Sequence, residues 1–208
     1  MSNGSIRIAA FFLWSIAASA LAAEPLRTVH DAARNRVWVL ERDALYLHDG
    51  AQKKRYELPG WVYVIDAYAC APDVALDAQG AAVVTSNVVP VLWRVEPATA
   101  QVTKHELVPD ADADKDVGFN GLAYASDQGV FFAVSATYGS LWRIDPLLRR
   151  AQKISVSLPL RDACGLAIDR TKTRRTVVLC AEGRAVHLAP DQRSAFVLAR
   201  PCTHESNL

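Results

Sequence analysis

The sequence predicts an all-β protein with a β-propeller-like fold of about four four-stranded antiparallel blades. Three observations lead to this fold class. A phrase recurs with a period of about 45 residues; short runs of β-branched and aromatic residues are bounded by turn residues; and no helical periodicity is sustained after residue 23. A single blade cannot cover both of its faces, so neighbouring blades must stack.

The repeat is clearest at the first and third runs of each unit. The segments 74–77 (VALD), 122–125 (LAYA) and 166–169 (LAID) occupy equivalent places, and LWRVEP at 92–97 matches LWRIDP at 141–146. The alternative of a β-sandwich with a similar number of strands is disfavoured, because a sandwich has no reason to repeat a phrase at a fixed period.

Four such units fill the chain after its first segment. We expect one domain over residues 23–208, with blades over about 26–59, 72–109, 119–159 and 163–200. Tyr46, Trp93 and Trp142 occupy the same place in the first three units, and we expect all three aromatic rings to fill contacts between blades.

Residues 1–22 are predicted to form a secretory signal peptide. A charged start ending at Arg7 is followed by an uncharged apolar stretch and by Ala20-Leu21-Ala22, the preferred cleavage site. The apolar stretch is short for a bilayer span, which needs about 20 residues, although an uncleaved anchor is the alternative. The mature protein is therefore expected to be periplasmic or secreted, without a stable membrane span after signal removal.

Composition and charge exclude several classes of protein. The chain is 51% hydrophobic, which is ample for a packed core and excludes a disordered chain. It carries 23 Lys and Arg against 22 Asp and Glu, and loss of Arg7 with the signal leaves the mature chain neutral. Because this balance lacks the basic excess typical of nucleic-acid binding, we expect no nucleic-acid partner.

The phrase NGLAYASD at 120–127, followed by LWRIDP at 141–146, resembles a blade of the β-propellers of the gluconolactonase/senescence-marker-protein-like and NHL-repeat superfamily. The resemblance covers about residues 72–190. It implies a ring of more blades than the four recognised here, so we expect either a compact four-bladed ring or an open arc that another chain completes.

The resemblance also implies a divalent metal, such as Ca²⁺, at the mouth of the central channel. Asn120 matches the family's Asn ligand, Asn87 is expected to line the same channel, and Asp162 is the carboxylate nearest to Cys164-Gly165, which replaces the family's Asp-Gly phrase. Because the expected Glu and Asp ligands are missing and a hard cation needs several oxygens, we predict no cofactor and assign no catalytic residue.

The acidic run over 110–116 begins like a calcium-binding EF-hand loop. Lys115 stands where that loop requires Gly, and Gly121 stands where it requires a bidentate Glu, so the motif is incomplete. Two interpretations remain open for this run: weak Ca²⁺ binding by alternate carboxylates, or a solvated loop between blades.

The cysteines predict disulfides, because an exported protein meets an oxidising compartment. Their spacing contains no CxxC pair, which makes a zinc or thioredoxin-type site a poor match. One pairing joins Cys164 to Cys180 and Cys70 to Cys202, and it is favoured if Asp169 lies opposite Thr176. The rival pairing joins Cys70 to Cys164.

These observations favour an exported, non-catalytic binding or scaffold protein that uses interblade loops or the channel mouth, with a protein or a small molecule as partner. The two longest connections, 59–73 and 109–120, are the predicted binding loops. Their candidate contact residues are Trp61, Tyr63, Tyr68, Asp112, Asp114 and Asp116. An extra strand packed on a blade is the alternative for the aromatic residues of this set.

Two alternative functions remain. One is a metal-dependent lactone or ester hydrolase of gluconolactonase-like type with a rearranged ligand set. The other is a half-propeller subunit of a larger periplasmic complex, in which a homo- or hetero-oligomer completes the ring.

Overall fold

The computed structural model describes residues 24–65, 70–110, 118–135, 137–156, 160, 165–169, 176–181, 184–188 and 195–201, with side chains described as far as residue 168. The predicted signal peptide lies outside these residues. No helix in the described ranges is long and apolar enough to cross a membrane.

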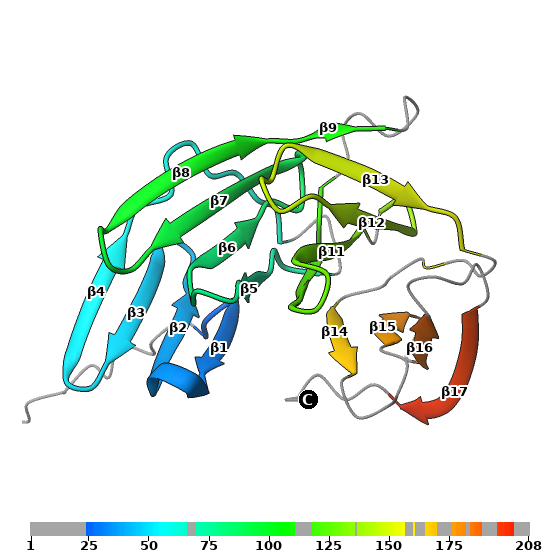
Figure 1. Ribbon diagram of the computed structural model, residues 1–208, viewed down its shortest axis with the longest axis horizontal. Helices are drawn as coiled ribbons and strands as arrows, with labels where there is room; N and C mark the ends of the chain where they lie inside the picture. The colour runs from blue at the N-terminus through cyan, green and yellow to red at the C-terminus, as the bar shows by residue number, and fades with distance from the viewer. Residues whose placement is uncertain are drawn as a thin grey trace, which may run out of the picture.

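The chain folds into four β-sheets, which we call blades 1 to 4 (Figure 1). Blade 1 consists of β1 (Arg27–Asp31), β2 (Arg36–Leu40), β3 (Leu45–Asp49) and β4 (Gln52–Tyr56), and a single 3₁₀ turn, η1 (Ala32–Arg34), joins its first two strands. Blade 2 consists of β5 (Val74–Leu76), β6 (Ala82–Thr85), β7 (Val91–Glu96) and β8 (Gln101–Glu106).

Blades 3 and 4 follow the same order. Blade 3 consists of β10 (Gly121–Ala125), β11 (Val130–Ser135), β12 (Ser140–Ile144) and β13 (Arg150–Ile154), with β9 (Val108–Pro109) added at its outer edge. Blade 4 consists of β14 (Leu166–Asp169), β15 (Thr176–Ala181), β16 (Arg184–Leu188) and β17 (Ala195–Pro201). The predicted all-β class and the four antiparallel units are confirmed.

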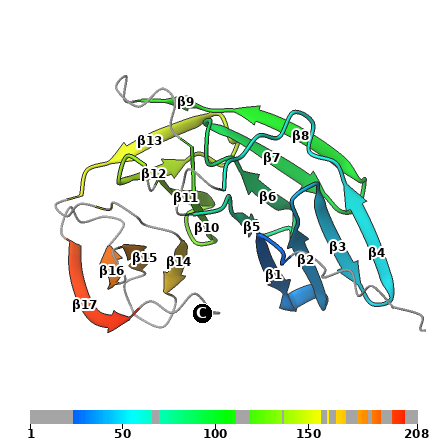
Figure 2. The same ribbon diagram turned by 180° about the vertical axis from the view of Figure 1, so that it is seen from behind.

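The blades follow one another along an arc, and both views show blades 1 and 4 at its two ends (Figures 1 and 2). The first strand of each blade is innermost: β1 lies beside β5, β5 beside β10, and β10 beside β14. The last antiparallel strand of each blade, β4, β8, β13 or β17, lies on the outer rim.

Hydrophobic side chains fill the seams between successive blades. Trp38, Leu45 and Trp93 belong to the core between blades 1 and 2, whereas Phe119 and Trp142 belong to the core between blades 2 and 3. A third core, around Phe132 and Leu141, faces blade 4. Because each blade buries one face against its neighbour, the stack supplies the core that no single sheet could form.

The expectation for the three equivalent aromatic residues is confirmed at two positions and wrong at the third. Trp93 and Trp142 are fully buried in the seams. Tyr46 is half-buried and lies on the face of blade 1 that points away from blade 2, since its neighbours Leu45 and Leu47 point into the seam and strand residues alternate between faces. No described blade covers this face.

The second blade is joined to the third by an added strand that the sequence did not indicate. Residues 108–110 leave blade 2 and pair in parallel with β13, where Val108 N–H donates to the Arg149 carbonyl (2.9 Å) and Asp110 N–H to the Ala151 carbonyl (3.0 Å). The Asp110 carboxylate accepts a further bond from Lys153 N–H (2.7 Å). Part of the predicted 109–120 loop is therefore a cover for the edge of blade 3.

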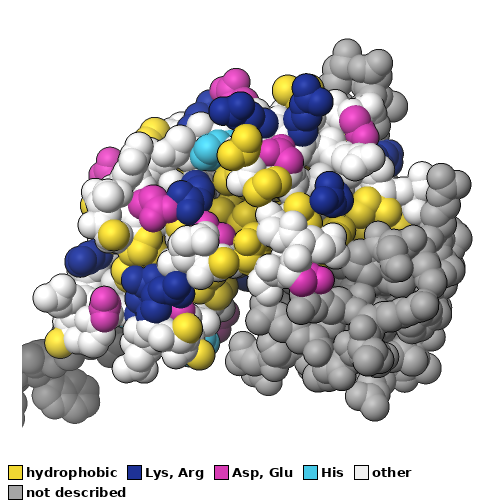
Figure 3. Space-filling view, in the orientation of Figure 1, with side chains coloured by type: hydrophobic (Ala, Val, Ile, Leu, Met, Phe, Trp, Pro, Cys, Tyr) yellow, Lys and Arg dark blue, Asp and Glu magenta, His cyan; other side chains and the backbone are white. Residues whose placement is uncertain are grey.

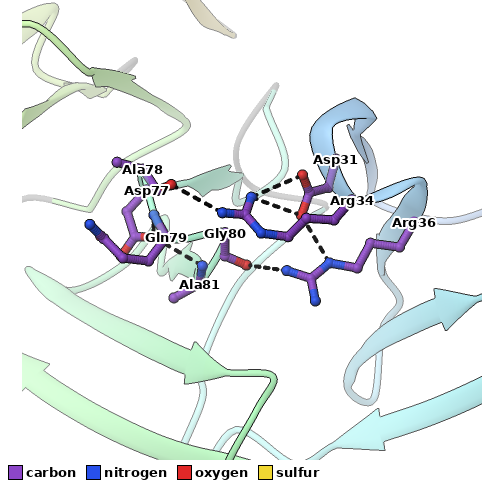
Figure 4. Close-up of polar contacts among 8 residues, drawn as sticks. All are labelled: Asp31, Arg34, Arg36, Asp77, Ala78, Gln79, Gly80 and Ala81. Atoms are coloured by element: carbon purple, nitrogen blue, oxygen red, sulfur yellow. Dashed lines mark hydrogen bonds and ion pairs between the residues drawn. The ribbon is translucent and has the colours of Figure 1, made fainter.

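Figure 4 shows the polar contacts that join blades 1 and 2 at the end of the sheets carrying the β1–β2 and β5–β6 turns. Buried Asp31 accepts bonds from Arg34 (3.2 Å) and Arg36 (2.9 Å). The two guanidinium groups also donate to the Ala78 carbonyl (3.2 Å) and the Gly80 carbonyl (3.1 Å), respectively. Each arginine therefore links a blade 1 carboxylate to the backbone of blade 2.

Candidate functional site

The predicted site residues that the structure describes gather at the opposite end of the sheets. This end carries the turns after β2 and β6 together with the segments that connect blades. We call it the loop face and define it by residues 41–44, 59–65, 70–73, 86–90 and 118–120.

Asn87 and Asn120 meet at the loop face. Asn87 lies two residues after β6, Asn120 directly precedes β10, and both side chains are buried. Their amide nitrogens donate to the same acceptor, the Cys70 carbonyl, at 3.0 Å and 2.8 Å. The structure thus brings together the two Asn residues predicted to share a channel mouth, but their N–H groups hold the backbone of a connecting segment.

Asn87 also binds the backbone of Val64 through both ends of its carboxamide. Its Nδ2 donates to the Val64 carbonyl (2.5 Å), and its Oδ1 accepts from Val64 N–H (3.0 Å). Asp162, the third residue of the predicted metal set, lies outside the described residues. Within the described ranges, no three His, Cys, Asp or Glu side chains lie close enough together to hold a metal ion. The metal site that the family resemblance implies stays untested.

Cys70 is buried and disulfide-bonded. The side chains of Cys164, Cys180 and Cys202 lie outside the described set, so the pairing stays a prediction. The hairpin register on which one pairing depends is confirmed, because Asp169 lies opposite Thr176.

The sequence did not single out Asp73, which joins three blades beside the two Asn residues. Its carboxylate accepts backbone bonds from Val74 of β5 (2.8 Å) and Leu122 of β10 (2.8 Å), and it pairs with Arg27 of β1 (3.3 Å). Burial raises the pKa of Asp73, although Arg27 favours its charged form. An Asp just before a strand is an ordinary turn residue in sequence, and its partner on β10 is visible only in the fold.

Thr85 and Ser86 continue this network of buried polar groups. The Thr85 hydroxyl donates to the Phe119 carbonyl (2.8 Å) and accepts from Asp73 N–H (2.8 Å). The Ser86 hydroxyl donates to the Val62 carbonyl (2.7 Å) and accepts from two backbone N–H groups of the β6–β7 turn. Both hydroxyls therefore hold connecting segments in place.

The aromatic part of the predicted binding loop is fixed firmly to blades 1 and 2. Trp61 Nε1 donates to the Thr85 carbonyl (2.9 Å), Tyr63 OH donates to the Arg42 carbonyl (2.7 Å), and the two rings lie 4.3 Å apart between centroids. Both are half-buried, whereas Val62 between them is 47% exposed. Residues 59–65 form no strand, so the alternative of an added strand is wrong for this segment.

The remaining binding-loop residues, Tyr68, Asp112, Asp114 and Asp116, lie outside the described residues. On the face seen in Figure 3, Lys and Arg side chains are interspersed with Asp and Glu around a hydrophobic middle. The described side chains of that face therefore form no continuous basic stripe of the kind that nucleic-acid binding uses.

The described polar side chains of the loop face hold the backbone of its connecting segments in place. The carboxamides of Asn87 and Asn120, the carboxylate of Asp73, and the hydroxyls of Thr85 and Ser86 each bind backbone groups of the protein. Asn87 and Ser86 hold residues 59–65 across the seam between blades 1 and 2, with Val62 outward. The other three side chains hold the neighbouring segments around Cys70 and Phe119.

No protein-family model matches the chain, and no curated protein matches it. Among solved structures it is similar to virginiamycin B lyase from Staphylococcus aureus, with a TM-score of 0.61 and 13% identity over 88% of this chain and 57% of that one. The hydrazine synthase of Kuenenia stuttgartiensis matches with a TM-score of 0.60 and 10% identity, over 90% of this chain and 53% of that one.

An auxiliary nutrient binding protein from Bacteroides thetaiotaomicron matches with a TM-score of 0.58 and 10% identity, over 85% of this chain and 42% of that one. At such identities the likeness shows the fold alone: this is a protein of the β-propeller type. The chain spans about half the length of the lyase and of the hydrazine synthase chain.

Proposed function

We propose that this chain is an exported, non-catalytic binding protein that contacts its partner through the loop face of blades 1 and 2. The observation that carries the proposal is the fixed segment 59–65. Six side-chain hydrogen bonds tie it to the two blades, and they leave Val62 exposed between two half-buried aromatic rings.

A segment held in this way is suited to binding for an energetic reason. Ordering a flexible loop during association reduces affinity, whereas a loop that the scaffold has already ordered avoids that loss. Tyr and Trp rings add large contact areas with few rotatable bonds. Arg42 and Asp43 are exposed in the neighbouring β2–β3 turn and offer a polar rim to the same surface.

Export is proposed from the predicted signal peptide, and a binding role agrees with the range of proteins that share the fold. Of the structural neighbours, one is described as an auxiliary nutrient binding protein, and another is a lyase solved with quinupristin. The fold thus serves both binding and catalysis, and the choice for this chain rests on its own loop face.

Site-specific photocrosslinking tests the proposal. A photoreactive residue replaces Val62 in one variant and Val108, which is 66% exposed on the outer rim, in the control. We expect partner crosslinks in source cells from position 62 and none of the same species from position 108. Crosslinks of one species from 108 and none from 62 would place binding elsewhere and overturn the proposal.

A hydrolase assay tests the non-catalytic part separately. The mature chain is titrated with Ca²⁺, Mn²⁺ and Zn²⁺ and assayed against a panel of lactones and esters. We expect no turnover with any of these metals. Metal-dependent turnover that is lost in Asn120→Ala would establish the hydrolase alternative instead.

A further inference from the structure

The outward face of blade 1 differs in chemistry from the faces that occupy the same place in blades 2 and 3. We call it the cap face and define it by Thr28, His30, Tyr46, His48, Lys53 and Arg55. All six point away from blade 2, because they alternate along their strands with residues that face the blade 1–2 seam.

The strand register shows that Tyr46 of blade 1 is equivalent to Trp93 of blade 2 and Trp142 of blade 3. Tyr46 lies between Val39 and Arg55 across its sheet, as Trp93 lies between Val84 and Lys104, and Trp142 between Ala133 and Lys153. The two Trp side chains are buried against the preceding blade. Tyr46 therefore stands where a further blade would pack.

The residues around Tyr46 are polar where the other two blades are apolar. His30, His48 and Lys53 occupy the register positions of Leu76, Val95 and Val102 in blade 2, and of Tyr124, Ile144 and Ala151 in blade 3. In those blades the six residues are apolar or aromatic members of the seams. The change is therefore confined to the blade face that has no described neighbour.

Charges of blade 1 itself cover the Tyr46 ring. Lys53 Nζ lies 4.0 Å from the ring centroid and pairs with Glu41 (3.1 Å). The Tyr46 hydroxyl donates to Asp43 (2.9 Å), which also pairs with Arg55 (3.3 Å). The bond from Tyr46 holds the pKa of Asp43 below its ordinary value, as expected for a carboxylate that stays charged.

Packing another blade on this face would remove these charges from water. Lys53 and Arg55 are 48% and 43% exposed, and their partners Glu41 and Asp43 are 36% and 55% exposed. Desolvation of ion pairs often exceeds the attraction they gain in return. Stacked-repeat proteins use a polar outer face on a terminal repeat to keep the stack soluble.

We propose that blade 1 is a capping blade whose outward face remains in solvent, so that the arc is not completed by another chain stacked on this face. The inference goes beyond the loop-face proposal because it concerns the outward strand face of blade 1, which meets the loop face only at the β2–β3 turn. It argues against a half-propeller whose ring is completed by another chain packed on blade 1.

Lysine labelling tests the proposal with a matched control in the same molecule. Lys53 and Lys104 are 48% and 43% exposed, and each pairs with one Glu at 3.1 Å and 3.0 Å. The full chain is expressed in its source cells and acetylated with an amine-reactive reagent before purification. We expect the two lysines to be modified at rates within about twofold of each other.

Protection of Lys53 by about tenfold or more relative to Lys104 would show that a partner covers the cap face, and would overturn the proposal. Crosslinking from position 62 reads a different surface, so loss of the loop-face proposal and loss of the cap proposal are distinguishable.

A second test restores seam chemistry to the cap face. The triple variant H30L/H48V/K53V copies the residues of blade 2, and we expect its molar mass by light scattering to rise with concentration while the wild type stays constant. The control Q101L/T103V/K104V adds apolar side chains at three exposed positions of β8 and should not associate. A folded H30L/H48V/K53V variant that stays monomeric would show that these polar residues do not keep the face free.

Discussion

At the residue scale, single buried polar groups connect strands that are far apart in the chain. Asp73 touches β1, β5 and β10, and the amides of Asn87 and Asn120 converge on the Cys70 carbonyl. Buried groups of this kind stabilise a fold only when their partners are in place, because an unpaired buried polar group costs about 1–3 kcal/mol.

The raised pKa of Asp73 gives a prediction about pH. A carboxyl group whose pKa is higher in the folded than in the unfolded state binds its proton more readily when folded, so its ionisation reduces stability. The ordinary pKa of an Asp carboxyl is 3.8. As pH rises from below this value through the raised pKa of folded Asp73, the free energy of unfolding of the wild type should fall relative to that of Asp73→Asn. Urea unfolding across this range measures the difference, and an opposite slope would contradict it.

Gly80 gives a second residue-scale prediction. Its φ of +79° is unfavourable for any side chain, and a Cβ would lie 2.5 Å from the Arg34 guanidinium. Gly80→Ala should therefore lower the free energy of unfolding by about 1–2 kcal/mol. Gly50→Ala is the control, because its φ is +56° and nothing lies within 4 Å, so equal losses in both variants would exclude a contribution from the Arg34 contact.

At the scale of elements, the third strand of each blade shows how position in the stack decides the role of an aromatic side chain. Trp142 of β12 is fully buried between blades 2 and 3, and its indole N–H donates to Ser140 (2.8 Å). Tyr46 of β3 occupies the same register position with its ring under Lys53. The two strands share this register, but β3 carries His48 where β12 carries Ile144, and no described blade packs on the Tyr46 face.

Truncation of these two rings should have unequal effects. Trp142→Ala should lower the free energy of unfolding by about 3–5 kcal/mol, because it leaves a large cavity in a closed seam. Tyr46→Ala should cost about 1 kcal/mol or less, because its ring is partly solvated and contacts the exposed charged groups of Lys53 and Asp43. Chemical denaturation measures both, and similar losses would indicate that the cap face is buried in the native protein.

At the scale of the whole molecule, the arc is a short stack in which the inner blades have two packed faces and blade 1 has one described neighbour. Stability in such stacks is the sum of repeat and interface contributions, so the end of the stack opens more easily than its middle.

Hydrogen exchange should follow this order. Backbone amides of β10, between blades 2 and 4, should exchange more slowly than those of β1, whose blade packs on one side only. Mass spectrometry of peptides covering the two strands measures the rates. Equal protection of β1 and β10 would indicate that a partner or another part of the chain covers blade 1.

The sequence predicts the fold well for a physical reason. Each blade is a local unit whose turns, β-branched runs and phrase positions are set within about 45 residues, and repetition strengthens a pattern that would be weak once. The phrases at 74–77, 122–125 and 166–169 coincide within one residue with β5, β10 and β14, and the hairpin register at Asp169 and Thr176 is as predicted. The added strand β9 was missed because two residues carry no periodicity.

The site is less predictable from sequence, because its geometry depends on contacts between blades. Asn87 and Asn120 were expected to lie near one another, and they do, yet the shared Cys70 acceptor is 17 and 50 residues away from them in the chain. Asp73 was missed for the same reason, since its partner Leu122 is 49 residues away.

A stack of four-stranded blades with an apolar pattern on the strands can be read from the amino-acid sequence alone, because these properties arise within each repeat. Contacts between blades, which are visible only in the folded protein, decide three further features. They decide which face of each blade is covered, that the buried amides hold a connecting segment, and that Tyr46 lies under charges instead of in a seam. Burial depends on the neighbouring blade: the equivalent aromatic side chain is core in blades 2 and 3, where the seam is closed, and surface in blade 1, whose outward face has no described neighbour.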